Sequence, residues 1–327
     1  MLKRSWSAAL IVSVVFILIG SAFTSVFADT SAPAGNGLSI SPLTTNIVIN
    51  SGQTQIVPLY IKNVTGSEAT IEVQIDDFTA NSNETGQPLL LLNGETAPSH
   101  SLKNYIAPIE NVNLSAGQQQ EINVSISIPK NTPGGGYYGA VRFIPITTSS
   151  GKSITLTASV ASLILVRVPG NVIDSLNLAS FGVEQSSGSD QAIFFSNHNL
   201  QADIRFQNTG NVQEQPFGKA VLKDGNKEVG IYEINNTVPA SNVLPGSIRK
   251  FTINLTNIGF IGKYTLEGNF GYGVSGQLVS GSTTFYVIPL SVIIIAIVII
   301  LLILIAIFVT PRLIRMHDRR VVRRSRI

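Results

Sequence analysis

QEINVSISIP, residues 120–129, alternates apolar and polar side chains along its length. Ile122, Val124, Ile126 and Ile128 occupy every second position, and polar side chains stand between them. A period of two residues is that of a β-strand with one face in a core and the other in water. The stretch therefore predicts a sheet that covers a hydrophobic core on one side.

Further segments repeat this strand pattern on both sides of residues 120–129. They lie at residues 54–63, 69–76, 153–168, 201–208, 219–232, 249–257 and 262–270. Within one of them, Asp224-Gly225 is a typical two-residue hairpin turn. The segments between the two ends of the chain show strand after strand and no convincing amphipathic helix, so we predict an all-β protein.

Three pairs of segments recur in the same order along the chain. Residues 59–75 (LYIKNVTGSEATIEVQI) are echoed by 204–222 (IRFQNTGNVQEQPFGKAVL), 114–129 (LSAGQQQEINVSISIP) by 244–259 (LPGSIRKFTINLTNIG), and 136–142 (GYYGAVR) by 262–268 (GKYTLEG). Short strands and turns at this spacing are typical of immunoglobulin-like β-sandwiches. We predict two tandem sandwiches, residues 38–168 and 171–286, although a single larger sandwich is an alternative.

Both ends of the chain carry membrane-targeting patterns. Residues 1–28 have the charged start, apolar centre and small-residue cleavage site of a signal peptide, and 29–37 follow as a linker. Residues 287–309 form an almost unbroken apolar run, long enough for one C-terminal transmembrane helix. The arginine-rich tail, 310–327, is expected in the cytoplasm under the positive-inside rule. The chain is therefore predicted to be a single-pass type I protein of the cell membrane, with its sandwiches outside the cell and its span in the lipid bilayer.

Composition excludes several classes of function. The chain has no cysteine, so disulfides and thiol chemistry are absent. Acids outnumber bases between residues 29 and 286, which argues against binding nucleic acid or another polyanion by charge alone. His100 and His198 are the only histidines before the span, and neither sits in a recognisable catalytic pattern. We predict a non-enzymatic protein with no catalytic residue, no metal centre and no cofactor.

One stretch raises a question of its own, NTPGGGYYGAVRFIP at residues 131–145. A strand that starts with three glycines indicates a tight bend or a close backbone approach. We predict a tyrosine corner, in which Tyr138 and, in the second module, Tyr264 turn their hydroxyl groups back to the preceding backbone. The alternative is a ligand-binding loop, with the rim formed by Gly134, Gly135, Gly136, Tyr137 and Tyr138.

A second candidate rim begins with the acidic pair Asp76-Asp77. Asn81, Asn83 and Glu84 follow, and oxygen-rich loops of this kind can hold Ca²⁺. The spacing matches no EF-hand loop, so we predict a solvated turn that adds to the ligand-binding surface.

Three stretches of the first module form a recognisable pattern: residues 38–75 (LSISPLTTNIVINSGQTQIVPLYIKNVTGSEATIEVQI), 79–90 (TANSNETGQPLL) and 126–143 (ISIPKNTPGGGYYGAVRF). In these stretches the module resembles the peptidoglycan-binding domain of the WxL-interacting protein family of bacterial cell-surface proteins. This resemblance implies a signal peptide, two sandwiches, one span and a basic tail. It also implies that the first sandwich binds peptidoglycan and that the second binds a partner surface protein or a host ligand.

The expected function is therefore to bind the cell wall, to tether partner surface proteins, or both. The alternative is an accessory membrane subunit that docks on a transporter or secretion complex. The apolar span speaks against docking through charged groups within the membrane, because it contains none.

Overall fold

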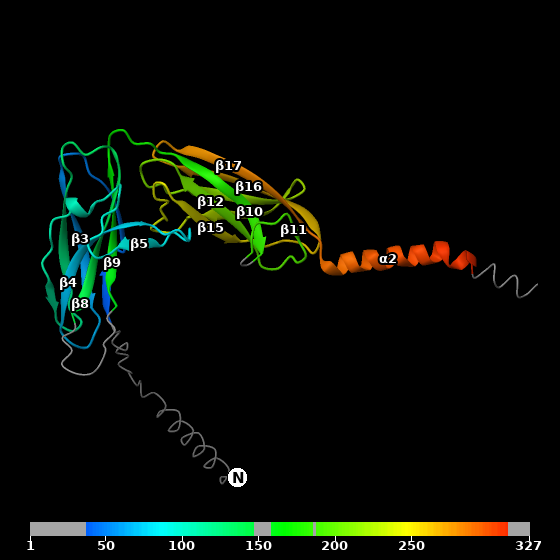
Figure 1. The fold of residues 1–327 in the computed structure, drawn as a ribbon, viewed down its shortest axis with the longest axis horizontal. Coiled ribbons are helices and arrows are strands. Elements are labelled where there is room, and N and C mark those ends of the chain that lie inside the picture. Colours follow the sequence, from blue (N-terminus) through cyan, green and yellow to red (C-terminus); the bar gives the residue numbers. More distant parts are fainter. Residues whose placement is uncertain (1–36, 147–157, 186–187, 313–327) are drawn as a thin grey trace, which may run out of the picture.

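A computed structural model describes residues 37–146, 158–185 and 188–312 (Figure 1). It confirms the predicted fold class, two immunoglobulin-like β-sandwiches followed by one apolar helix. The predicted signal peptide, most of the linker and all but the first residues of the basic tail lie outside the described residues.

The first sandwich packs a three-stranded sheet, in the order β1-β3-β7, against a larger one, β2-β9-β8-β4-β5, in which β6 also pairs with β4. The bounds are β1 Leu38–Ser41, β2 Thr44–Val48, β3 Thr54–Asn63, β4 Ala69–Ala80, β5 Pro88–Leu91, β6 Val112–Leu114, β7 Gln119–Ser127, β8 Gly135–Ile146 and β9 Val160–Val168, with a short 3-10 helix, η1, at Lys103–Tyr105. The first strand segment changes sheet, because β1 pairs with β3 while β2 runs parallel to β9. The segment β1–β2 therefore connects the two sheets along one edge of the sandwich.

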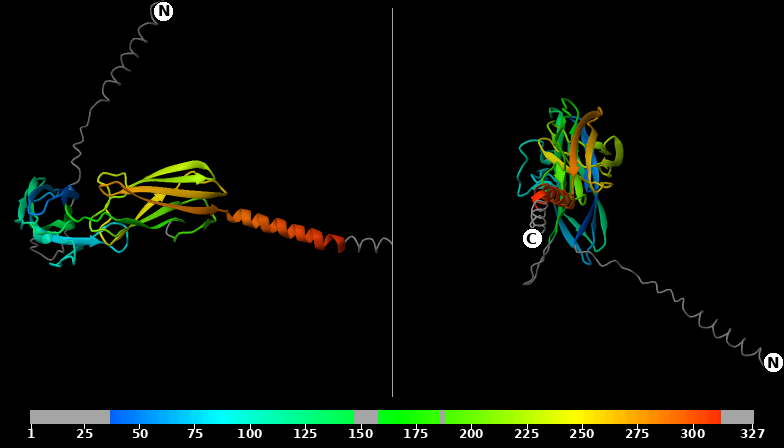
Figure 2. Two further views of the ribbon diagram at one scale, coloured as in Figure 1. Left: turned by 90° about the horizontal axis from the view of Figure 1, so that it is seen from above. Right: turned by 90° about the vertical axis from the view of Figure 1, so that its right-hand side faces the viewer.

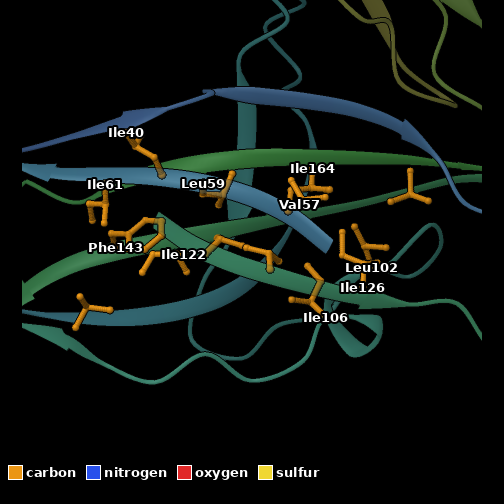
Figure 3. Packing of buried hydrophobic residues seen from close by; sticks show 14 of the residues in the cluster. Ile40, Val57, Leu59, Ile61, Leu102, Ile106, Ile122, Ile126, Phe143 and Ile164 are labelled. Atoms are coloured by element: carbon orange, nitrogen blue, oxygen red, sulfur yellow. The ribbon is translucent and has the colours of Figure 1, made fainter. Parts of the chain in front are cut away.

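The alternation that predicted the fold builds the core of this sandwich. Ile122, Val124 and Ile126 of β7 are buried against Leu59 and Phe143 of the neighbouring strands (Figure 3). Full burial of each such side chain contributes about 1.5–3 kcal/mol relative to leaving it in water. The intervening positions of β7 face outward, as the period of two requires.

The second sandwich has the sheets β10-β12-β15 and β11-β17-β16-β13-β14. The bounds are β10 Leu176–Gln185, β11 Ile193–Phe194, β12 Leu200–Asn208, β13 Phe217–Asp224, β14 Lys227–Ile234, β15 Ile248–Asn254, β16 Gly262–Tyr272 and β17 Gln277–Val287. β13 and β14 form the hairpin predicted from Asp224-Gly225. Aromatic rings fill much of the core; Phe206 and Phe270, for example, meet edge to face with 5.1 Å between ring centres.

Each sandwich has a buried asparagine at the end of a long strand, Asn63 in β3 and Asn208 in β12. The Asn63 amide nitrogen donates to the carbonyl oxygens of Ser67 and Leu114 at 2.8 and 3.0 Å. Its amide oxygen accepts the backbone N–H of Thr65 at 2.9 Å. One side chain thus satisfies backbone groups from two separate loops.

Asn208 makes the same set of bonds in the second sandwich. Its amide nitrogen donates to the carbonyl oxygens of Val212 and Val243 at 2.7 and 2.8 Å, and its oxygen accepts the N–H of Gly210 at 2.9 Å. The repeat seen in the sequence is therefore a repeat of hydrogen bonding as well as of strand order.

The helix α2, Leu290–Phe308, continues from the end of β17 and points away from the first sandwich (Figure 1 and the left view of Figure 2). Within Leu290–Arg312, the most apolar stretch of 18 residues has a mean hydropathy of 3.9, and none of that stretch is buried within the protein. This helix is long and apolar enough to cross a membrane.

Candidate functional site at the junction of the two sandwiches

The three glycines of the sequence lie where the two sandwiches touch. A Cβ atom at Gly134 would lie 2.7 Å from the backbone nitrogen of Asn171, in the connection between the sandwiches. Gly136 donates its N–H to the carbonyl oxygen of Asn211 at 2.7 Å, and the Asn211 amide donates to the Gly134 carbonyl at 3.2 Å. At Gly135, a Cβ atom would lie 3.0 Å from the Asn211 carbonyl oxygen. The glycines thus permit close contact between two domains.

The tyrosine corner of the first sandwich is formed by Tyr137, so the prediction for Tyr138 is wrong. The Tyr137 hydroxyl donates to the carbonyl oxygen of Pro133 at 2.9 Å, and its ring packs on the core. Tyr138, one residue later, lies on the outer face and donates to the Gln213 side-chain oxygen at 3.1 Å, across the junction. Successive residues of a strand point to opposite faces, so a shift of one residue exchanges the two roles.

The prediction for Tyr264 is correct. Its hydroxyl accepts the backbone N–H of Gly259 at 2.7 Å, and its ring is buried in the second core against Phe285. Gly135 pairs with the last residue of β9 as Gly262 pairs with the last residue of β17, which makes Tyr137 the counterpart of Tyr264.

Asp76 and Asp77 do not form a solvated turn, and that prediction is wrong. Both lie within β4 and are buried, with 3% and 0% of their surfaces exposed. Asp76 pairs with Arg142 of β8 at 2.7 Å. Asp77 accepts the backbone N–H groups of Ala97, Leu102 and Lys103 at 3.0 to 3.2 Å. These carboxylates hold the fold together, and their oxygens are not free to form a ligand rim.

The hairpin between β4 and β5 reaches from the first sandwich to the second. Its tip residue Glu84 forms a two-bond ion pair with Arg205 of β12, with 2.7 Å between Nε and Oε2. The Glu84 carbonyl oxygen accepts the N–H of Lys250 in β15 at 2.8 Å. Together with Tyr138, this contact ties the two sandwiches at separate points.

A cavity of about 240 Å³, here called the junction cavity, lies between the two sandwiches. Phe78, Leu163 and Leu165 of the first sandwich and Leu244 of the second supply its apolar wall. Ser241, Asn242 and Arg249 supply its polar wall. Mixed walls of this kind suit a small group that is partly apolar and partly charged.

Arg249 is the cation of the junction cavity, and it forms no ion pair with any described carboxylate. Its guanidinium donates to the Asn242 carbonyl oxygen and the Ser241 hydroxyl at 2.8 and 3.0 Å. It lies 5.4 Å from the centre of the Phe251 ring, and a Cβ atom at Gly86 would collide with it. Burial lowers the pKa of Arg249, which remains charged at neutral pH.

A second cavity of about 390 Å³ borders the same junction, and Arg167, Gln213 and Glu214 are among the residues that line it. Arg167 of β9 pairs with Asp174 at 2.8 Å. Burial raises the pKa of Glu214 to about 8, and a hydrogen bond to Asp174 acts in the same direction. The Glu214 carboxyl accepts the N–H of Gly273 at 2.9 Å. A carboxyl group that titrates near neutral pH therefore lies beside the contact between the sandwiches.

Three acids also gather on the outer face of the second sandwich, Glu184, Asp190 and Asp203, with one oxygen of each within 4.8 Å of the others. Lys250 lies among them, and its ammonium is 2.9 Å from Glu184 and 3.1 Å from Asp203. Burial, and repulsion from Asp203 and Glu184, raise the pKa of Asp190. The Lys250 ammonium therefore occupies the position that a metal ion would take among these three acids.

Of the predicted site residues, the structure brings the glycine and tyrosine segment to the junction and leaves Asp76 and Asp77 apart from it. Reasoning from sequence missed Arg249 and Gln213. The only available signal for Arg249 was a pair of bases, Arg249-Lys250, at the start of a strand. Gln213 gave none, because a glutamine in a loop is ordinary.

No family model and no curated protein matches the chain. Among solved structures, it is similar to chaperones of bacterial fimbriae and pili. The Class 5 fimbriae chaperone CfaA is 14% identical, with 78% of this chain and 100% of the other covered and a TM-score of 0.38. The chaperone in the CsuC–CsuE pre-assembly complex of Acinetobacter baumannii Csu pili is 12% identical, with 74% and 97% covered and a TM-score of 0.36. E. coli DraB is 11% identical, with 76% and 96% covered and a TM-score of 0.32.

These likenesses concern the fold alone. The resemblance of the first module to WxL-interacting proteins stays a prediction.

Proposed function

We propose that the protein is a non-enzymatic binding protein of the cell surface, anchored by α2 as a type I membrane protein. Its two sandwiches hold a ligand of the cell wall at their junction. The observation that carries this proposal is the junction cavity, where Arg249 faces the contact between the domains without an acidic partner. A bound carboxylate would neutralise a partly buried charge that the fold leaves unpaired.

Peptidoglycan fits this chemistry better than a polyanion does. Its stem peptides present carboxylates next to small apolar side chains, which match one guanidinium beside the leucine and phenylalanine wall of the junction cavity. Binding of this kind depends on one placed cation and tolerates an acidic ectodomain. The resemblance of the first module to a peptidoglycan-binding domain points to the same ligand.

The test is co-sedimentation of the full chain, in detergent, with insoluble peptidoglycan. Arg249→Gln removes the charge while keeping a long polar side chain, and Lys227→Gln, at an exposed hairpin, is the matched control. We expect saturable pelleting of the wild type and of Lys227→Gln, and a loss of about tenfold or more in affinity for Arg249→Gln, since a charged hydrogen bond contributes about 1.5–3 kcal/mol.

If Arg249→Gln pellets with peptidoglycan as strongly as the wild type, the ligand does not bind in the junction cavity. No pelleting of the wild type would contradict wall binding itself. The unfolding midpoint of each variant, measured in parallel, shows whether the junction has remained intact.

Binding of a partner surface protein is a second candidate, favoured by one observation. β14 is an outermost strand of its five-stranded sheet, and Ile231 on it is 58% exposed. An added strand from a partner would pair with this edge. A photo-crosslinking side chain at Ile231, compared with one at the exposed Glu121 of β7, tests this: an adduct to one defined protein at 231 alone supports strand addition, and equal labelling at both positions contradicts it.

The docking of an accessory subunit on a transporter or secretion complex has less support. The described span offers apolar side chains on every face and no charged group between Leu290 and Phe308 for a partner helix to recognise.

A further inference from the structure

The end of the second sandwich next to α2 exposes a group of large apolar side chains. This base patch consists of Ile193, Phe195, Phe260, Ile261 and Tyr286, which are 49%, 58%, 58%, 57% and 39% exposed. Strand pairing brings them together, because Ile193 pairs with Tyr286. Contiguous apolar surface of this kind is unusual where a soluble domain meets only water.

The loops that carry the base patch are tied to one another and to the end of β17. The Asn197 amide donates to the carbonyl oxygen of Ile258 at 2.9 Å, which joins the loop after β11 to the loop before β16. Ile288 donates its N–H to the carbonyl oxygen of Phe194 at 2.8 Å. The patch is therefore a fixed feature of the domain end, and it surrounds the point where the chain leaves for the helix.

The connection from the second sandwich to α2 is short. β17 ends at Val287 and α2 begins at Leu290, so only Ile288 and Pro289 lie between them. Two residues span at most about 7 Å, and Ile288 is held by its hydrogen bond. In both views the helix leaves directly from this end of the domain (Figures 1 and 2).

The length of the helix sets the depth of the base patch. The 19 residues of α2 are about 28 Å long at roughly 1.5 Å per residue, close to the hydrocarbon thickness of about 30 Å. The first charged residue after Leu290 is Arg312, which belongs at the cytoplasmic surface. With Arg312 there, Leu290 lies at the outer edge of the hydrocarbon, and the base patch is level with the lipid headgroups.

Tyr286 suits that depth, because tyrosine combines an apolar ring with a polar hydroxyl and is enriched at membrane interfaces. Phe195 and Phe260 add apolar rings to the same surface. Lys263 adds a matching cation. Its ammonium lies 6.0 Å from the centre of the Tyr286 ring, and its side chain can extend toward the phosphate groups of lipids.

We propose that the base patch rests in the headgroup region of the outer leaflet and holds the second sandwich in a fixed orientation on the membrane. The sandwich would then stand on the bilayer through its loops as well as through α2, and the junction cavity would be held at a constant height above it. This inference rests on the proposed membrane anchoring.

The experiment measures the depth of single tryptophans in the full chain, in a Trp6→Phe background that removes the only native tryptophan. Probes are Phe195→Trp and Phe260→Trp in the base patch. Phe217→Trp, 57% exposed at the opposite end of the sandwich, is the matched control, and Ile297→Trp reports on the span itself. Each variant is placed in nanodiscs of phosphatidylcholine and phosphatidylglycerol, with lipids brominated near the headgroup or near the chain ends.

We expect lipids brominated near the headgroup to quench the probes at 195 and 260 and to shift their emission to the blue. Only lipids brominated deep in the chains should quench the probe at 297, and neither lipid should quench the probe at 217. Quenching at 297 without quenching at 195 and 260 would overturn the docking while leaving the anchor intact. Absence of quenching at 297 would contradict the anchor. A blue shift at 195 that no brominated lipid quenches would mean that protein, such as a second copy of the chain, covers the patch, and would also overturn the proposal.

Discussion

The two sandwiches share the plan of one module, but they differ on the outer face, at the residue that follows the corner tyrosine. Both close on a buried asparagine, Asn63 or Asn208, and both place a corner tyrosine in the core, Tyr137 or Tyr264. On the outer face, the residue after the corner tyrosine is Tyr138 in the first sandwich and a threonine in the second.

Tyr138 lies in a small apolar cluster with Phe78 and Leu165, against which Leu244 of the second sandwich packs. The hydroxyl of the corresponding Thr265 lies 3.3 Å from the hydroxyl of Thr284, within the same sandwich. The comparison shows that the interior of the module is fixed by its buried polar and aromatic residues. The difference on the outer face contributes to the contact between the copies, together with the glycines of β8 and the Glu84 hairpin.

The largest expected effect concerns what the copies share. Asn208→Ala removes the donor from two buried carbonyl groups, and Asn63→Ala removes it from one buried and one partly buried carbonyl group. Each substitution should lower the free energy of unfolding by about 3 kcal/mol. Denaturant unfolding of the full chain measures this, with the exposed Asn123→Ala as the control. If only one of the two substitutions lowers the free energy of unfolding, the two asparagines are not equivalent.

The next effect concerns the junction alone. Gly134→Ala places a Cβ atom 2.7 Å from the Asn171 nitrogen and forces the sandwiches apart, at a cost of about 2 kcal/mol. Calorimetry should resolve two separate unfolding transitions in this variant. Gly66→Ala, where the added Cβ atom meets nothing within 4 Å, should behave as the wild type. Identical traces for both variants would speak against a close-packed junction.

The pH dependence of stability should also localise to the junction. Because the pKa of Glu214 is raised to about 8 in the folded protein, the folded state binds more protons than the unfolded state between about pH 4.5 and pH 8. The contribution of this group is therefore fully present below about pH 4.5 and is lost as the pH rises through 8. Glu214→Gln should flatten the melting temperature over this window, and an unchanged pH profile would be inconsistent with a buried carboxyl group there.

The smallest effects separate the tyrosines. Tyr137→Phe and Tyr264→Phe each remove one hydrogen bond within a sandwich and should cost about 1 kcal/mol. Tyr138→Phe removes a bond between the sandwiches, so it should leave each sandwich as stable as before and should loosen only the junction. The measurement is the unfolding midpoint of each variant, with hydrogen exchange of β8 as a readout of the junction. A loss in the first sandwich with Tyr138→Phe and none with Tyr137→Phe would reverse the assignment.

Much of the fold could be predicted from the sequence, because the period of two in segments such as residues 54–63 and 120–129 is set by the geometry of a strand. The repeat was also visible, although its register was not. The two tyrosines are adjacent and the echo aligned the later one with Tyr264, whereas strand pairing selects Tyr137. No local pattern distinguishes the two faces of a strand that has apolar residues on both.

The site was harder to predict for the same kind of reason. Ile71, Val73, Ile75 and Asp77 occupy every second position of β4. This alternation was the available sign in the sequence that Asp77 faces inward and is buried. Its partners are backbone N–H groups about twenty or more residues away, which no spacing rule identifies. The junction itself depends on how two domains pack, and only the structure places Arg249 beside Gly86.

The most direct test of the central claim, that the two copies are joined into one rigid unit, is a distance measurement between them. The chain has no cysteine, so Glu121→Cys on β7 and Glu228→Cys on β14 give two unique spin-label positions, one on each sandwich. Double electron–electron resonance on the full chain in nanodiscs should give a single narrow distance distribution that broadens in Gly134→Ala. A broad distribution in the wild-type chain would contradict the rigid junction, and with it the cavity on which the proposed function depends.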